Sequence, residues 1–347
     1  MKKVLALVLT LVLVVFALSA CAVPAPAPSA SAPASQSAAP APSEPAPSEP
    51  AKSEQPAAAA KVAFFVKTLN NPFFVTMQEG AETKAKELGI EVFVDGPPAE
   101  TEVEKQVAMI ENAIVQKYSV IVLAPCAKEP LVPVVKKAFD AGIPVINVDD
   151  FIDETLLKNA GAEVAAFIGS DNVAGGKLAG EKMAEIFKDA TGEVQVAVIE
   201  GMAGVPNSEK RRDGFLEGIK ANAKIKVVAQ QPADWDVQKG YDVAANIIQA
   251  NKDLKGIFCC NDQMALGAIK AIEAAGKSKD ITLIGYDATD EGRAAVKAGT
   301  MVGTVAQYPD DMGVKAMELA AKITKGEKYT ANEFIGTKVE LITKENA

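Results

Sequence analysis

Polar and aromatic side chains gather directly after an apolar run of the chain. The segment Lys67-Thr-Leu-Asn-Asn-Pro-Phe-Phe74 follows residues 62–66 and closes on two adjacent aromatic rings. A cation, an amide and two rings at the end of one strand offer hydrogen bonds together with flat apolar faces. This combination suits a small ligand that carries several hydroxyl groups.

Further hydrogen-bonding side chains follow the later apolar runs, in both halves of the chain. They include carboxylates, amides and one guanidinium, and charged groups form hydrogen bonds of roughly 1.5–3 kcal/mol, about double those of neutral groups. The residues at these ends are Pro125, Asp149, Asp150, Glu200, Arg211, Asp234, Trp235, Asn261, Asp262 and Asp287. We therefore expect two sets of polar and aromatic side chains that face each other across a ligand cleft.

Several of these residues also have an ordinary structural explanation. Asp149 and Asp287 could each cap a helix or a turn, although their matched positions in the two halves favour the cleft. Lys67 could be a solvated charge at the end of a strand, and Arg211 could be a solvated charge at the start of a helix.

The chain contains no histidine among its 347 residues. Ser-His-Asp and Cys-His nucleophile arrangements are therefore excluded, and so is the commonest zinc ligand. We expect no enzyme activity, no metal and no cofactor, although carboxylate pairs could still perform acid–base chemistry. Cys126, Cys259 and Cys260 are interpreted as small buried side chains in strands, with a redox role as the alternative.

From residue 61 onward, short β-rich runs alternate with segments of helical periodicity. In the first half we expect strands at residues 62–66, 91–94, 120–123 and 144–148, and helices at residues 72–88, 103–116 and 130–141. The same order restarts with strands at residues 194–199, 226–229, 256–260 and 281–285, and helices at residues 209–220, 237–249 and 264–274. This pattern predicts an α/β fold with two doubly wound lobes, each a parallel sheet covered on both faces. Neither lobe has a Gly-x-Gly-x-x-Gly turn after its first strand, so a dinucleotide site is not expected.

The N-terminal 60 residues differ in composition from the rest of the chain. Lys2 and Lys3 precede an apolar run that ends in Leu18-Ser-Ala-Cys21, a pattern typical of an export signal. Leu-Ser-Ala-Cys resembles the lipobox of bacterial lipoproteins, so we expect a signal peptide at residues 1–20 and a lipid on Cys21; an uncleaved membrane anchor is the alternative. Residues 22–60 are almost wholly Ala, Pro, Ser and Glu, which predicts a disordered tether. The protein would then be extracytoplasmic and anchored to the cell membrane by its lipid.

Five segments of the chain have distinctive motifs: Thr68-Leu-Asn-Asn-Pro-Phe-Phe74, Ser170-Asp-Asn-Val-Ala-Gly-Gly-Lys177, Gln231-Pro-Ala-Asp-Trp-Asp236, Asn261-Asp-Gln-Met-Ala-Leu-Gly267 and Ala306-Gln-Tyr-Pro309. They resemble motifs of the ribose-type, type I periplasmic binding proteins of sugar ABC transporters, and the similarity covers essentially all of residues 61–343. The family's fold implies a hinge that the chain crosses three times, near Ser170, Gln307 and Gly336. The resemblance thus implies an N-terminal lobe of residues 61–169 with 308–336, and a C-terminal lobe of residues 170–307 with 337–347.

The resemblance also implies which residues contact the sugar. By the resemblance, these are Asn71, Phe73, Phe74, Asp149, Arg211, Trp235, Asn261, Asp287 and Gln307. Lys67, Ala124 and Asp150 depart from the ribose binders, which carry Ser, Asn and Arg at these positions. With these residues the chain looks closer to the D-allose-binding type: Ala124 would open space for the added hydroxymethyl group, and Lys67 and Asp150 would bind it. D-Psicose or another six-carbon sugar is the alternative.

The leading hypothesis is a monomeric, lipid-anchored solute-binding protein that closes over a monosaccharide and delivers it to the permease of an ABC transporter. A transcription regulator with the same sensor lobes would need an N-terminal helix-turn-helix, and the export signal and tether stand in its place. Two further hypotheses are a receptor that presents the sugar to a membrane kinase or chemoreceptor, and a carbohydrate enzyme with paired carboxylates. Nucleic acid is not an expected partner, because the net charge is −9.

Overall fold

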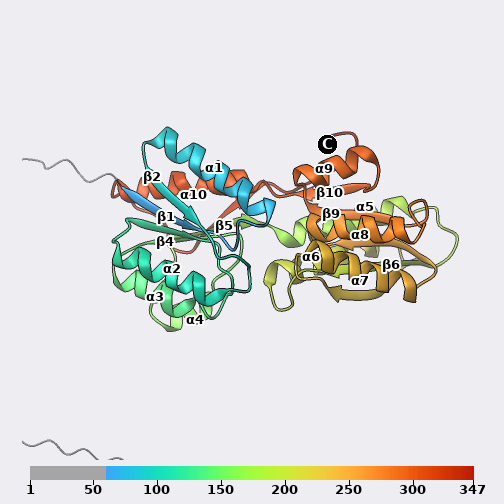
Figure 1. Cartoon of the computed structure of the whole chain (residues 1–347), viewed down its shortest axis with the longest axis horizontal. Coiled ribbons are helices and arrows are strands. Elements are labelled where there is room, and N and C mark those ends of the chain that lie inside the picture. Colours follow the sequence, from blue (N-terminus) through green and yellow to red (C-terminus); the bar gives the residue numbers. More distant parts are fainter. Residues whose placement is uncertain (1–59) are drawn as a thin grey trace, which may run out of the picture. The chain divides into compact units, whose positions relative to one another are not determined.

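The computed structural model describes residues 60–347. These residues form two six-stranded sheets, and most strands of the first sheet come from the N-terminal half of the described residues (Figure 1). Five of its strands are β1 (Lys61–Phe65), β2 (Glu91–Asp95), β3 (Val120–Leu123), β4 (Val145–Val148) and β5 (Ala166–Ser170). They are parallel, in the order β5-β4-β3-β1-β2, and β11 (Glu333–Thr337) pairs in parallel with β5.

The second sheet repeats this order. Its strands are β6 (Val194–Glu200), β7 (Ile225–Pro232), β8 (Leu254–Cys259), β9 (Thr282–Asp287) and β10 (Gly303–Ala306), parallel in the order β10-β9-β8-β6-β7. The short β12 (Glu340–Ile342) is antiparallel to β10. The repeated strand order confirms the prediction of two similar doubly wound lobes.

Helices cover both faces of the first sheet. Figure 1 shows α1 (Pro72–Leu88) and α10 (Pro309–Thr324) on one side, and α2 (Val103–Val115), α3 (Val132–Asp140) and α4 (Glu154–Asn159) on the other. Side chains of β1 alternate between the two layers, since Phe64 packs in one apolar cluster with α1 and α10 and Phe65 packs in the other with α2 and α3. A strand that is buried on both faces has to be continuously apolar, as residues 62–66 are.

In the second lobe α5 (Asn172–Ile186) packs on α6 (Pro206–Gly218), and α7 (Val237–Ala250) packs on α8 (Asp262–Ala274). The helices η1 (Ile219–Ala221) and α9 (Asp290–Ala298) complete this lobe. A Cβ atom at Gly176 on α5 would lie 2.1 Å from the carbonyl oxygen of Arg211 on α6. The close contact between these helices therefore requires glycine, and it fixes the backbone that carries Arg211.

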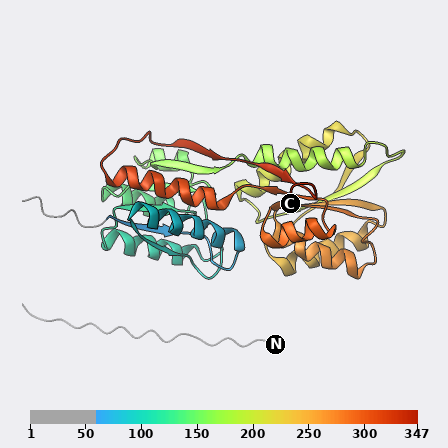
Figure 2. The same cartoon turned by 90° about the horizontal axis from the view of Figure 1, so that it is seen from above.

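The chain crosses between the lobes at three places, as predicted. β5 leads into α5, β10 leads into α10, and β11 leads into β12; in Figure 2 the red strand β11 runs beside β5 before the chain passes to the second lobe. Ser170 Oγ lies 3.0 Å from Thr337 Oγ1, and Thr337 Oγ1 donates to the carbonyl oxygen of Gln307 at 3.1 Å. Hydrogen bonds thus join all three crossing segments.

Most predicted elements agree with the structure, and the differences have simple reasons. α6 begins at Pro206 and not at residue 209, because a proline is well accommodated in the first turn of a helix. Residues 149–193, to which no element is assigned from the sequence, contain α4, β5 and α5. The predicted signal peptide, the lipidation site Cys21 and the tether up to residue 59 lie outside the described residues.

The three cysteines at positions 126, 259 and 260 are buried and form no disulfide. Only Cys259 lies in a strand, so the interpretation as strand residues is wrong for Cys126, in the loop after β3, and for Cys260, directly after β8. Burial raises the pKa of both of these thiols to about 12. Such thiols stay protonated at neutral pH, which argues against a redox role.

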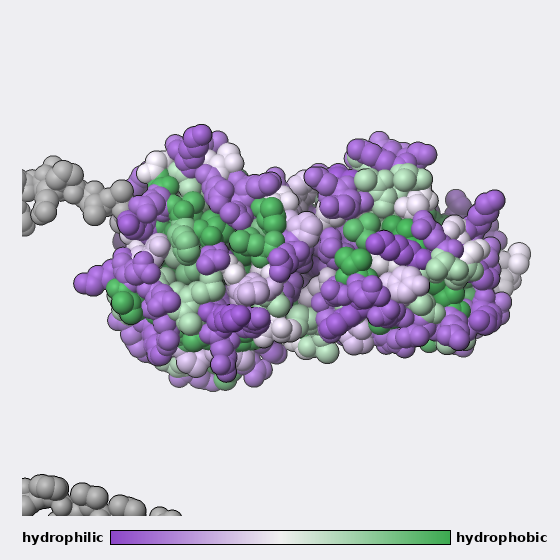
Figure 3. Space-filling model, viewed as in Figure 1, coloured by the Kyte–Doolittle hydropathy of each residue, from purple (hydrophilic) through white to green (hydrophobic). Residues whose placement is uncertain are grey.

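Hydrophilic residues cover most of the molecular face shown in Figure 3, with smaller apolar areas between them. This follows from the packing, because the apolar side chains of the central strands lie within the cores of the two lobes. Among residues 60–347, no helix combines the length and the apolar character that a membrane span requires.

Candidate functional site

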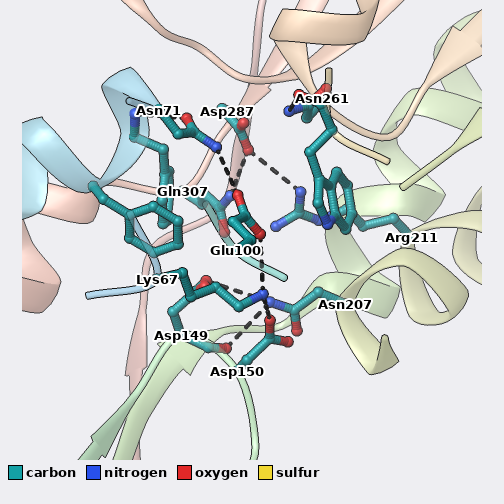
Figure 4. A pocket seen from close by; sticks show the side chains of 13 residues that line it. Lys67, Asn71, Glu100, Asp149, Asp150, Asn207, Arg211, Asn261, Asp287 and Gln307 are labelled. Carbon is teal, nitrogen blue, oxygen red and sulfur yellow. Dashed lines mark hydrogen bonds and ion pairs between the residues drawn. The ribbon is translucent and has the colours of Figure 1, made fainter. Parts of the chain in front are cut away.

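Thirteen side chains from both lobes line a cavity at the carboxyl ends of the parallel strands (Figure 4). The space between them, its solvent-open part included, is about 310 Å³. The nine residues that the resemblance assigns to the sugar, together with Lys67 and Asp150, all lie here with Glu100 and Asn207, whereas Pro125, Glu200, Asp234 and Asp262 do not line this cavity. The lining residues are Lys67, Asn71, Phe73, Phe74, Glu100, Asp149, Asp150, Asn207, Arg211, Trp235, Asn261, Asp287 and Gln307.

Lys67 is a buried cation held by two carboxylates. Only 3% of its side chain is exposed, and its Nζ lies 2.5 Å from Asp150 Oδ2 and 3.4 Å from Glu100 Oε2. Burial alone would lower the pKa of Lys67, but the attraction of Asp150, Glu100 and Asp149 outweighs it and raises the pKa. The explanation of Lys67 as a solvated strand-end charge is therefore wrong.

Asp149 and Asp287 occupy matching places in the two lobes, after β4 and at the end of β9. Both have left-handed backbone angles, with φ of 63° and 107°, a conformation that costs non-glycine residues on the order of 1–3 kcal/mol and clusters at functional sites. Neither aspartate caps a helix, because Asp153 caps α4 and Thr289 caps α9. The explanation as helix caps is wrong for both residues.

The carboxyl groups of Asp149 and Asp287 have unusual proton affinity. The pKa of each is raised to about 7, and burial is the largest cause. At Asp149 the nearby Asp150 contributes to the rise, while Lys67 and Arg211 oppose it; at Asp287 Arg211 opposes it. Near neutral pH such groups can donate or accept a hydrogen bond, and a hydroxyl group can do the same.

Arg211 is held in a fixed orientation on α6, with 4% of the residue exposed. Its Nε donates to Asn172 Oδ1 at 2.7 Å, and its Nη1 donates to the carbonyl oxygen of Cys260 at 2.8 Å and to Asp287 Oδ1 at 3.4 Å. The guanidinium carbon lies 4.0 Å from the ring centre of Tyr286. No hydrogen bond among residues 60–347 uses Nη2, so this nitrogen is available to a ligand. The explanation of Arg211 as a solvated charge is wrong.

Asn71 and Asn261 are helix caps as well as cavity residues. The Oδ1 atom of Asn71 accepts from the backbone N–H of Phe73 at 3.1 Å, and that of Asn261 accepts from Met264 at 2.9 Å. Because capping turns each oxygen toward its helix, the amide nitrogens of both side chains are directed to other partners. Asn71 Nδ2 donates to Glu100 Oε1 at 3.3 Å, and Asn261 Nδ2 donates to the carbonyl oxygen of Trp235 at 3.4 Å.

Aromatic rings reach the cavity from both lobes. Phe73 and Phe74, in the first turn of α1, pack edge to face with ring centres 5.1 Å apart. Trp235 comes from the loop before α7 and has a left-handed backbone with φ of 65°. A Cβ atom at Gly201 would lie 2.0 Å from the indole ring, so the position of Trp235 depends on glycine there.

Three buried polar atoms of the cavity have no hydrogen-bond partner within the described chain. They are the acceptors Asp150 Oδ1 and Gln307 Oε1 and the donor Trp235 Nε1. Leaving a buried polar group unpaired costs about 1–3 kcal/mol. A ligand with several hydroxyl groups would supply the missing partners.

The sequence analysis misses two lining residues, Glu100 and Asn207. Asn207 precedes Arg211 by one turn of α6 and donates to the carbonyl oxygen and to Oδ1 of Asp149, at 3.3 Å in both cases. Asn207 and Arg211 are four residues apart, so they lie on one face of the helix. This signal is missed because the predicted helix begins at residue 209, after Asn207. Glu100 follows β2, whose carboxyl end points to the same edge of the sheet as those of the other strands.

Ala124 does not line the cavity. It is fully buried at the end of β3, where its N–H donates to the carbonyl oxygen of Phe65 at 2.8 Å. Ala124 is therefore no ligand contact itself, and the idea that its small size opens space for a ligand group stays a prediction. Within residues 60–347 no group of three or more His, Cys, Asp or Glu side chains is placed to hold a metal ion.

The chain matches the family model described as periplasmic binding protein domain over residues 62–328. It is 41% identical over 273 residues to the D-allose-binding periplasmic protein of Escherichia coli, covering 78% of this chain and 86% of that protein. The ribose import binding protein of the same species is 38% identical over 270 residues, with coverage of 78% and 86%.

Among solved structures, an ABC transporter periplasmic solute binding protein from Actinobacillus succinogenes with bound D-allose is similar to this chain. The TM-score is 0.78 at 33% sequence identity, and the match covers 82% of this chain and 98% of that one. The predicted resemblance and the predicted fold class are both confirmed. The chain belongs to the periplasmic binding protein domain family of sugar-binding, ABC-transporter solute-binding proteins, and its homologues are transport proteins and not enzymes.

Proposed function

We propose that this protein binds one monosaccharide, D-allose or a related hexose, between its lobes and delivers it as a monomer to the permease of an ABC transporter. The observation that carries the proposal is the set of unpaired buried atoms, Asp150 Oδ1, Gln307 Oε1 and Trp235 Nε1, in a cavity that aromatic rings also line. A sugar carries hydroxyl groups for the polar atoms and apolar C–H faces for the rings.

The charged residues of the cavity give the sugar its strongest hydrogen bonds. Asp149 and Asp287 are acceptors that belong to different lobes, and Arg211 offers its free Nη2 as a donor. Hydrogen bonds to such groups contribute about 1.5–3 kcal/mol each, more than those between neutral partners. A sugar held by Asp149 and Asp287 would therefore link the two lobes.

The proposed lobes are residues 61–169 with 308–336 and residues 170–307 with 337–347, which turn about the three crossings when the sugar binds. Direct contacts from α6 support a closed arrangement in which the lobes touch. Asn207 donates to Asp149, and Lys210, one turn further along the helix, places its Nζ 3.8 Å from the ring centre of Phe151. The partners, Asp149 and Phe151, belong to the N-terminal lobe, whereas α6 belongs to the C-terminal lobe.

The lipid anchor is proposed from the sequence. Cys21 would be acylated after removal of residues 1–20, and the tether up to residue 60 would connect the lipid to the lobes. Cells that express wild type should incorporate a labelled fatty acid into the membrane-bound protein. The Cys21→Ser variant should carry no label and leave the membrane fraction, whereas a labelled or membrane-bound variant would contradict the anchor.

The preference for a hexose rests on Lys67 and Asp150. If this pair meets the hydroxymethyl group that distinguishes D-allose from D-ribose, D-allose should bind at least about tenfold tighter, a difference of 1.4 kcal/mol. The variant that combines Lys67→Ser with Asp150→Arg should shift the preference toward D-ribose. Calorimetry of both proteins with both sugars decides the question, and a wild type that prefers D-ribose, or an unchanged ratio in the variant, would contradict it.

A thermal-shift screen tests the function itself. Purified protein is heated with each of a set of pentoses, aldohexoses and ketohexoses, and with glycerol as a polyol control. A ligand that binds only the folded state stabilises it by about 2.7 kcal/mol at a hundredfold excess over its Kd. We expect one or a few sugars to raise the Tm, and a complete absence of such shifts would refute the proposed function.

A further inference from the structure

Glu100 enters the cavity from the loop between β2 and α2, and hydrogen bonds to the segment that follows β1 hold this loop in place. The carbonyl oxygen of Pro98 accepts from Thr68 Oγ1 at 3.2 Å and from Asn70 Nδ2 at 2.7 Å. A Cβ atom at Gly96 would lie 2.9 Å from the carbonyl oxygen of Val66, which shows how closely the loop approaches the end of β1. The backbone therefore holds Glu100 beside the polar segment that begins at Lys67.

The carboxylate of Glu100 binds two other residues of the cavity. Its Oε1 accepts from Asn71 Nδ2 at 3.3 Å, its Oε2 lies 3.4 Å from Lys67 Nζ, and only 13% of the side chain is exposed. Figure 4 shows the side chain between Asn71 and Lys67. A carboxylate has about four acceptor positions, so these two contacts leave Glu100 able to accept from a ligand hydroxyl.

Glu100 lines the sugar cavity and also two larger neighbouring spaces, and it borders one of them together with Asp150 and the other together with Asn71 and Trp235. One of them is lined by Pro125, Phe151 and Met202 among other residues, the other by Asn70, Asp234 and Met202 among others, and Glu100 lines both. Their volumes are about 870 and 990 Å³ with their solvent-open parts included. Shortening the Glu100 side chain would thus open this edge of the cavity toward space that a substituent on the sugar could occupy.

We propose that Glu100 is a specificity-determining residue of the sugar site, and this inference rests on the proposed function. Its carboxylate accepts a hydrogen bond from one free hydroxyl group at the Lys67 end of the sugar. Its bulk excludes any sugar in which that hydroxyl carries an alkyl group or a glycosidic bond. The ligand class is therefore restricted to monosaccharides that are unsubstituted at this position.

The test measures the affinity of three proteins for a series of derivatives. The sugar with the largest thermal shift is prepared with each hydroxyl in turn removed or O-methylated, and each form is titrated calorimetrically into wild type, Glu100→Ala and Glu100→Gln. Glu104→Gln is the matched control, because Glu104 is an exposed residue of α2 that does not line the cavity. Thermal unfolding confirms that each variant is folded.

For one hydroxyl position of the sugar only, wild type should bind the derivative O-methylated at that position at least 100-fold more weakly than the parent sugar. Glu100→Ala should reduce this gap to less than tenfold, whereas Glu100→Gln, which keeps the bulk, should retain it and lose mainly the discrimination against the deoxy form. Unchanged selectivity in Glu100→Ala, or an equal loss for every derivative, would overturn the inference while leaving the proposed function intact. If no sugar binds wild type, the proposed function itself is refuted and the inference with it.

Discussion

The substitution Arg211→Lys keeps the positive charge of the site but removes the planar guanidinium fork. In the wild type, Nε and Nη1 are bound to Asn172 Oδ1 and to the carbonyl oxygen of Cys260, at 2.7 and 2.8 Å, which leaves Nη2 for the sugar. A lysine ammonium group is a single point of contact and cannot hold both protein acceptors and also reach the ligand. At least one charged hydrogen bond to the sugar should be lost.

A charged hydrogen bond contributes about 1.5–3 kcal/mol, so the Kd of the best sugar should rise about 10- to 150-fold. The assay is calorimetric titration at 25 °C, with thermal unfolding of the sugar-free variant as a separate readout. The unfolding experiment should show some loss of stability, because one of the two protein acceptors is left unpaired in a buried site, at a cost of about 1–3 kcal/mol.

Arg212→Lys is a closely matched control for this experiment. Arg212 is the next residue of α6, its side chain is 25% exposed, and it pairs with Glu200 and Asp213 outside the cavity. Its affinity should stay within about threefold of wild type, since surface ion pairs contribute little. If Arg211→Lys binds the sugar as tightly as wild type, the assignment of Arg211 to the ligand is refuted.

Three further predictions concern other parts of the site. Gly201→Ala places a Cβ atom 2.0 Å from the indole ring of Trp235 and should displace it. Sugar binding should weaken at least about tenfold, and the change in tryptophan emission on saturation should become smaller. A titration identical to that of wild type would contradict this. Lys210→Met removes the cation that lies 3.8 Å from the ring centre of Phe151, an interaction of about 1–2 kcal/mol. Sugar release, measured by stopped-flow fluorescence, should therefore become about 5- to 30-fold faster. Release at the wild-type rate would argue against this contact. Asp287 has a pKa of about 7 against an ordinary value of 3.8. Protonation of its carboxyl group therefore stabilises the sugar-free folded protein, fully below pH about 4. This stabilisation, at most about 4 kcal/mol, is lost as the pH rises through 7. The Tm of Asp287→Asn should therefore fall less than that of wild type between pH 5 and pH 8, and equal falls would show that Asp287 does not titrate in this range.

Much of the fold and the site could be predicted because both follow from local sequence patterns. The continuous apolar run at residues 62–66 predicts a strand buried on both faces, and the strand order places the residues after each run at one edge of the sheet. Asp149 and Asp287 could be placed in the cleft because they hold matching positions in a repeated pattern. Their left-handed backbone angles could not be predicted from the sequence alone, since Asp tolerates several conformations.

What could not be predicted depends on contacts between distant residues. Lys67 is buried only because Glu100 and Asp150, from two other loops, neutralise it, and lysine by itself favours solvent. Glu100 reaches the site because Thr68 and Asn70 hold its loop, an interaction that no local pattern reveals. The burial of Arg211 likewise depends on acceptors from other parts of the chain.

The central claim is that one sugar lies between the two lobes and contacts both of them. The most direct test is a crystal structure of the protein grown with the sugar that gives the tightest calorimetric binding. We predict one sugar molecule per chain, with hydroxyl groups within hydrogen-bond distance of Asp149 in the first lobe and of Arg211 and Asp287 in the second, and with a ring face against Trp235. A sugar bound elsewhere, or bound to one lobe alone at saturation, would contradict this account.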